Sequence, residues 1–158
     1  MGVAMLPRLL PLILLALPAA AQFSSIELRF EGVGCAPCIE SMPDRMKRLR
    51  GVESATVDAA KGVLTVKLTA QNRVRLEQVR DAIEQDGTKA RSAHVEIKGD
   101  AAQAESGWML SAAGLTVRYG LAGDALKAGS CVIAGDVTEM RPASGSLVIR
   151  VREQKMLP

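Results

Sequence analysis

The sequence has few of the residues on which several common protein functions depend. It contains one histidine, three cysteines and only 3% aromatic residues in a chain of 158. A single histidine excludes histidine-rich metal sites and most histidine-based catalytic triads, and three cysteines are too few for a disulfide-stabilised scaffold. The formal net charge of only +3 and the scarcity of aromatics argue against a nucleic-acid-binding protein, which typically has a dense basic face with stacking side chains. Apolar residues make up 48% of the chain, which is enough for a folded core.

The N-terminus is typical of a secretory signal peptide covering residues 1–21. An apolar run at 9–17 is followed by small residues, so cleavage after Ala21 is expected to leave Gln22 at the new terminus. A membrane anchor is the alternative, but it needs about 20 apolar residues, and this run is shorter and interrupted by Pro11. We therefore expect export, most simply to a bacterial periplasm, with no stable membrane insertion after cleavage.

Hydrophobic periodicity predicts an α+β fold in the first half of the mature chain. Alternating apolar residues indicate strands, and apolar residues three or four apart indicate helices. The β-α-β-β-α-β order is the ferredoxin-like plan, predicted for residues 24–99. The predicted elements are a strand around 26–30, a helix after the cysteine pair that ends at Gly51, strands at 52–59 and 63–69, a helix over 76–83 and a short strand at 95–97.

The second half has a different composition. Residues 100–107 are polar and contain alanine and glycine, which predicts a linker. Residues 108–158 show short β-like runs between glycine-rich turns, which predicts a small all-β domain. A β segment of this size is marginally stable alone, so we expect it to pack on the first domain or to pair with another chain.

Cys35 and Cys38 form a C-x-x-C pair where a loop enters the first predicted helix. Unpaired amides and partial positive charge at a helix N-terminus favour thiolate over thiol. Such thiols suit either soft-metal binding or thiol–disulfide exchange. Two thiolates match a two-coordinate Cu(I) or Hg(II) ion, whereas tetrahedral zinc requires four ligands. An inert disulfide with no substrate is the third alternative.

Gly32-Val33-Gly34-Cys35-Ala36-Pro37-Cys38 resembles the Gly-Met-Thr-Cys-x-x-Cys loop of heavy-metal-associated domains. That family includes copper chaperones, copper-ATPase modules and the periplasmic mercury-binding protein of mercury resistance. The resemblance covers residues 24–99, because the apolar positions after the second cysteine, the following hairpin and the second helix also match the family spacing. It implies that Cys35 and Cys38 are the metal ligands, that Cu(I) is the favoured ion and Hg(II) the second, and that a donor or acceptor protein with thiol ligands exchanges the metal.

The chain departs from the family pattern at three places. Val33 stands where methionine is usual, Gly34 where threonine is usual, and Thr88 with Lys89 where the family commonly has Tyr, Phe or Lys near the metal. These departures bear on the metal, the affinity and the partner more than on the fold.

A periplasmic dithiol–disulfide oxidoreductase is the main rival interpretation. Pro37 inside the cysteine pair and Pro43 beyond it resemble the active-site helix of thioredoxin-like enzymes, and Pro43 should kink the helix. Those enzymes also need a later proline facing the cysteines, and no proline occurs between Pro43 and Pro142. Because no group suited to acid–base chemistry adjoins the pair, the sequence favours a metal carrier over an enzyme.

Other chemistry-bearing residues have simpler interpretations. Cys131 lies in an apolar strand-like run and is predicted to be a buried structural thiol, with a third metal ligand or a resolving cysteine as the alternatives. His94 is predicted to be a solvated surface residue. Met42 and Met46 have the spacing of a helix core. The basic residues Arg45, Lys47, Arg48 and Arg50 are predicted to form a solvated helix face, or less simply a docking face for an acidic partner.

Overall fold

The computed structural model describes residues 22–32, 35–112, 115 and 117–158. The predicted signal peptide and the loop residues Val33 and Gly34 lie outside these ranges. Among the described residues, no helix has the length and apolar character needed to cross a membrane.

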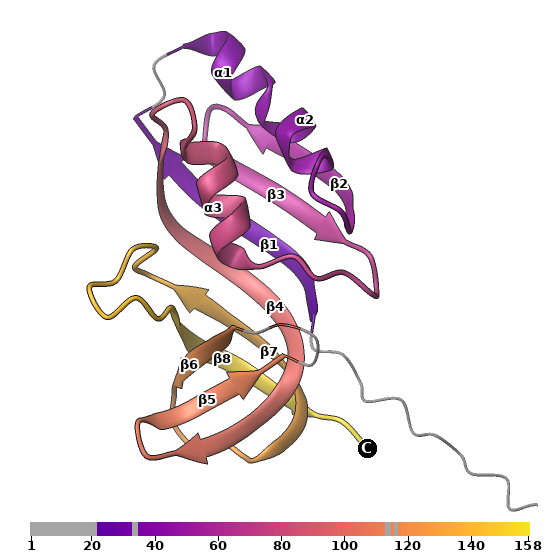
Figure 1. Cartoon of the computed structure of the whole chain (residues 1–158), viewed down its shortest axis with the longest axis vertical. Coiled ribbons are helices and arrows are strands. Elements are labelled where there is room, and N and C mark those ends of the chain that lie inside the picture. The colour runs from indigo at the N-terminus through magenta and orange to yellow at the C-terminus, as the bar shows by residue number, and fades with distance from the viewer. Residues whose placement is uncertain (1–21, 33–34, 113–114, 116) are drawn as a thin grey trace, which may run out of the picture.

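The first half contains the predicted β-α-β-β-α-β order, with the first helix divided in two (Figure 1). Its strands form an antiparallel sheet in the order β2-β3-β1-β4, and the helices cover one face of that sheet. Because strands predominate in the whole chain, the α+β description fits this half only. The elements are β1 (Gln22–Glu31), α1 (Ala36–Glu40), α2 (Met42–Lys47), β2 (Val52–Asp58), β3 (Val63–Leu68), α3 (Leu76–Glu84) and β4 (Lys89–Ala104).

The core lies between this sheet and its helices, where the periodicity predicted it. Met42 and Met46 are fully buried on α2, which confirms their core assignment. The strands contribute every second residue, because successive side chains of a strand point to opposite faces. The buried strand residues include Ile26, Leu28, Leu64, Val66, Val95 and Ile97.

The predicted kink at Pro43 is present as a break between two short helices. Helix α1 ends at Glu40, and α2 begins at Met42 with Pro43 in its first turn. Proline has no amide hydrogen to donate to the preceding turn, so it is tolerated at the start of a helix and interrupts the interior of one. The break places Ser41 between the cysteine-bearing turn and the core-packing turn.

Strand β4 continues far beyond the short strand that the sequence predicted. It is 16 residues long, and Asp100–Ala104 pairs with β5 (Gly107–Ser111) in a hairpin. Residues 100–107 are therefore strand and hairpin rather than the predicted linker. Of the small residues in this range, Ala101 fits the strand because it is buried between exposed Asp100 and Ala102, and Gly107 begins β5 with a positive φ of 109°.

The second half is a closed five-stranded barrel. Strand β4 pairs with β5 on one edge and with β7 (Gly129–Val137) on the other, and β6 (Arg118–Ala122) and β8 (Val148–Met156) complete the ring. The pairing order around the ring is β4-β5-β6-β8-β7, with β6 and β8 parallel. Closure satisfies the backbone groups on both edges of the strands. The predicted all-β character of this half is present, while the boundary between domains stays a prediction.

The barrel packs directly on the first half, as expected for a small β unit. The buried Tyr119 ring on β6 contacts Phe23 of β1 edge-to-face, with ring centroids 5.6 Å apart. Its hydroxyl donates to the Glu77 carboxylate at 3.1 Å and accepts from the Leu76 amide at 3.3 Å. Burial and the adjacent Glu77 carboxylate raise the pKa of Tyr119, so the phenol stays protonated. The two halves therefore share one continuous core.

Replacing Tyr119 with phenylalanine should destabilise the whole protein by about 1–3 kcal/mol. The aromatic contact with Phe23 is retained, while the buried Leu76 amide loses its acceptor. Denaturant unfolding monitored at Trp108 tests this. A free energy of unfolding unchanged within about 0.3 kcal/mol would show that the hydroxyl does not stabilise the junction.

Candidate metal centre

The turn at the start of α1 holds the two cysteines. Cys35 is the N-cap residue of α1, with an extended backbone, and its sulfur accepts a hydrogen bond from the Cys38 amide at 3.2 Å. Ala36 and Pro37 occupy the first helical positions, where the missing amide hydrogen of proline costs nothing. Cys35 is exposed and Cys38 half-buried. The structure thus places both predicted ligands together at one accessible end of the sheet.

The two cysteines are joined as a disulfide, with their Cα atoms 5.3 Å apart. Both sulfurs must be reduced before either can bind a metal, because the thiolate is the ligand. The reduced pair would offer two soft sulfur ligands from one turn. Among the described residues, no group of three or more Cys, His, Asp or Glu side chains is placed to hold a metal ion.

Arg45 is the principal residue near the pair whose role the sequence did not indicate. The sequence predicts a solvated helix face for Arg45, but its side chain is only 12% exposed. The guanidinium donates to the Cys38 carbonyl at 3.0 Å, to the Ala82 carbonyl at 3.1 Å and to the Asp86 carboxylate at 2.7 Å. One side chain of α2 therefore links α1, α3 and the turn that follows α3. A docking face made from the basic cluster would lack this residue.

Asp86 lies in the turn between α3 and β4 and completes the link. One carboxylate oxygen accepts from Arg45 and the other from the Thr88 amide at 3.0 Å. Burial alone would raise the pKa of Asp86, but hydrogen bonding by Thr88 and the Arg45 guanidinium outweighs it and lowers the pKa below its ordinary value. Only the tertiary fold brings residues 45 and 86 together, so the sequence pattern gave no signal for the pair.

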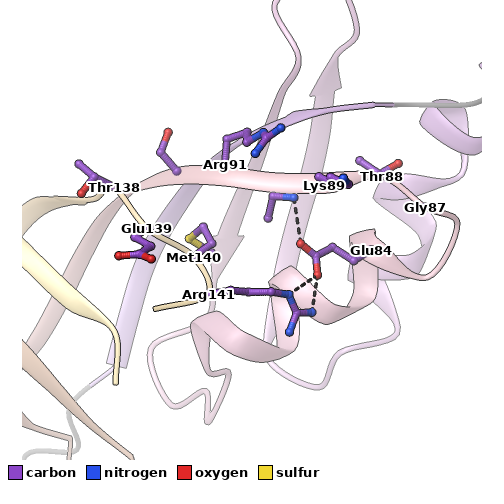
Figure 2. A pocket seen from close by; sticks show the side chains of 11 residues that line it. Glu84, Gly87, Thr88, Lys89, Arg91, Thr138, Glu139, Met140 and Arg141 are labelled. Atoms are coloured by element: carbon purple, nitrogen blue, oxygen red, sulfur yellow. Dashed lines mark hydrogen bonds and ion pairs between the residues drawn. The ribbon is translucent and has the colours of Figure 1, made fainter. Parts of the chain in front are cut away.

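The turn after α3 also borders a pocket of about 790 Å³. Figure 2 shows Glu84 between the Arg141 guanidinium and the backbone of β4; its carboxylate accepts from Arg141 at 2.9 Å and from the Ala90 amide at 3.1 Å. The residues from 138 to 141, which follow β7, form the opposite wall. The lining mixes cations with carboxylates, so the pocket presents no uniform charge.

The remaining candidates lie away from the pair. Cys131 is fully buried and unpaired in β7, which confirms a buried thiol. It faces Gly99 in the β4 register, whereas Glu31, four residues before Cys35, pairs with Lys89, so about 33 Å of β4 lies between these two positions at about 3.3 Å per residue. This separation along β4, together with the complete burial of Cys131, excludes it as a third ligand or resolving cysteine in this conformation.

His94 is half-exposed, as predicted, and takes part in a surface cluster on the helix-free face of the sheet. Its Nδ1 lies 2.7 Å from the Asp136 carboxylate, which also accepts from Arg152 at 2.6 Å. Hydrogen bonding by His94 and Arg152 holds the pKa of Asp136 below its ordinary value. The cluster does not contact the cysteine pair.

Comparison with known proteins identifies the family to which the first half is similar. The profile of the heavy-metal-associated domain matches residues 27–89. The copper chaperone CopZ of Staphylococcus haemolyticus is 37% identical over 60 residues, a match that covers 38% of this chain and 87% of that protein. This chain belongs to the heavy-metal-associated domain family.

Solved structures of copper proteins are also similar to part of this chain. A CopZ metallochaperone is 30% identical, with 42% of this chain and 98% of that chain covered and a TM-score of 0.39. The N-terminal domain of a potential copper-translocating P-type ATPase from Bacillus subtilis, solved with Cu(I) bound, is 25% identical, with 44% and 85% covered and a TM-score of 0.39. The barrel lies outside the residues that the family profile matches.

Replacing Asp86 with asparagine should destabilise the folded protein by about 1–3 kcal/mol at neutral pH, because the half-buried Arg45 loses its ionised partner. The folded pKa of Asp86 is lowered, so its stabilisation is full above the unfolded pKa of about 3.9 and is lost as the pH falls through the folded value. Urea unfolding of both proteins between pH 7 and pH 3 tests this. A stability difference that stayed constant over that range would contradict it.

Proposed function

We propose that this protein binds Cu(I) through the thiolates of Cys35 and Cys38 and passes the ion to a partner protein. The observation that carries the proposal is the accessible C-x-x-C turn at the start of a helix, within a heavy-metal-associated domain. Its similarity to a copper chaperone supports Cu(I) over other ions. Hg(II) has the same preference for two sulfur ligands and is the second candidate.

The ligand set decides the kind of metal. Thiolates are soft ligands and prefer soft ions such as Cu(I). A linear two-coordinate ion is satisfied by two sulfurs, whereas zinc takes four ligands. The amide of Cys38 already donates to the Cys35 sulfur in the oxidised state, and after reduction this bond would favour the thiolate.

Transfer requires no acid or base. A thiolate of the partner bonds to the metal, giving a three-sulfur intermediate, and one protein cysteine then leaves. The exposure of Cys35 allows such an approach, so Cys35 is the sulfur that the partner meets first. The partner is a donor or acceptor protein with thiol ligands, and the protein acts as a carrier rather than an enzyme.

An anaerobic Cu(I) titration against a competing chelator tests the proposal. The reduced protein without residues 1–21 should bind one ion per chain, and the double variant Cys35→Ser, Cys38→Ser should bind at least about a hundredfold more weakly because both soft ligands are lost. Cys131→Ser is the matched control, since that thiol is buried and remote, and it should bind like the wild type. Equal binding by the double variant and the wild type would refute the carrier proposal.

A dithiol oxidoreductase is the second candidate, and the Cys35–Cys38 disulfide in the structure favours it. The ferredoxin-like topology, rather than a thioredoxin-like one, argues against it. If wild-type protein fails to bind Cu(I) but catalyses the reduction of a model disulfide by a thiol, this second function replaces the first.

We further propose that the chain is exported, with a bacterial periplasm as its compartment, because residues 1–21 have the pattern of a signal peptide. Expression of the full chain in a Gram-negative host should yield periplasmic protein whose mass corresponds to a start at Gln22. Replacing Ala21 with a bulky residue such as leucine should block that cleavage. Full-length protein in the cytoplasm would contradict the proposal.

A further inference from the structure

The Cys38 carbonyl receives unusual support from side chains. It accepts from the Ser41 hydroxyl at 3.0 Å and from Arg45 Nη2 at 3.0 Å. The Cys38 carbonyl lies in α1, close to the break that separates α1 from α2. The orientation of the second cysteine therefore depends on side chains rather than on a continuous helix.

Arg45 transmits that support to a second element. Its guanidinium also contacts the Ala82 carbonyl of α3 and the Asp86 carboxylate in the turn that follows α3. That turn lies beside Gly32, which precedes the cysteine pair in the chain. A Cβ atom added at Gly32 would lie 4.0 Å from the Gly87 carbonyl oxygen. The planar guanidinium donates in several fixed directions at once, which a lysine ammonium on its flexible stem does not reproduce.

We propose that Arg45, held by Asp86, is a positioning residue for the cysteine pair. It fixes the turn of Cys38 against α3, so that the two sulfurs are held at the separation needed to act together. The part of this inference that concerns metal rests on the proposed function. The part that concerns the thiols does not, because a disulfide also requires both sulfurs to be held close.

Preorganisation has the same consequence for both reactions. Loosening the Cys38 turn adds conformational freedom that must be lost when the sulfurs close on each other or on one ion. Disulfide formation with oxidised glutathione joins two protein thiols, oxidised by two electrons, and releases two reduced glutathione molecules. Its equilibrium constant therefore measures the preorganisation of the pair without any metal.

The test is the equilibrium of the pair in glutathione buffers, measured for the wild type, Arg45→Met and Asp86→Asn. Arg45→Met should lower the equilibrium constant for disulfide formation about tenfold, which raises the reduction potential by about 30 mV. Asp86→Asn should change it in the same direction by a smaller factor. The double variant should match Arg45→Met, because the two residues act as one unit. Cu(I) affinity should fall about as much as the disulfide equilibrium constant.

Arg80→Met is the matched control. Arg80 is buried to the same degree, 13% exposed, and likewise contacts a carboxylate, Asp81, and a backbone carbonyl, that of Met140. It joins α3 to the barrel and not to the cysteine turn. Arg80→Met should lower the melting temperature like Arg45→Met while leaving the reduction potential at the wild-type value.

Two results would overturn the inference. One is an Arg45→Met protein with a lowered melting temperature and an unchanged potential; the other is an equal shift in Arg80→Met. If Arg45→Met does not fold, Asp86→Asn decides, with an unchanged potential counting against the inference. If the wild type fails to bind Cu(I), the proposed function fails, while the shifts in potential still decide the role of Arg45.

Discussion

The fold depends on one strand, β4, that pairs both with the sheet of the first half and with the strands of the barrel. Residues 93–98 of β4 pair with β1 on one edge and with β7 on the other, and Asp100–Ala104 then pairs with β5. Every second residue from Ala93 to Ala101 is buried, so the same alternation serves both halves. Were β4 to end at Ile97, as the sequence suggested, the barrel would lack its first strand and Tyr119 would lose its place against Phe23.

The helices and strands of the first half could be predicted from the sequence, because the buried residues of each element follow a regular spacing over a short stretch of chain. The alternation of Ile26, Leu28 and Phe30 and the helical spacing of Met42 and Met46 each depend on residues close together in the chain. The sequence does not indicate the extension of β4, because its polar and alanine residues from 100 to 104 have the composition of a linker, and only their pairing with β5 and β7 shows that they are strand. Strand order and barrel closure follow from pairings across long separations, which periodicity does not encode.

The cysteine pair could be located from its spacing, but its surroundings could not. The C-x-x-C motif and its place at a helix start were visible in the sequence, and the structure puts them on an accessible turn. The sequence predicts a solvated position for Arg45 because it lies, with Lys47 and Arg48, outside the apolar face of the helix; only Lys47 and Arg48 are exposed in the structure. Its partners, Ala82 and Asp86, lie about 40 residues away and meet it only when α2 packs against α3. The metal ligands follow from chemistry, whereas their support follows from packing.

The burial of Cys131 has a consequence for the order in which the molecule matures. Three cysteines allow three different single disulfides, and two of these would join Cys131 to the exposed turn. Once the barrel has closed, Cys131 is covered in β7 and far along β4 from the other two, so only Cys35 and Cys38 remain accessible to an oxidant. In a chain that folds before it is oxidised, Cys35–Cys38 is thus the disulfide that can form. One that is oxidised first risks a mispaired bridge that keeps the barrel from closing.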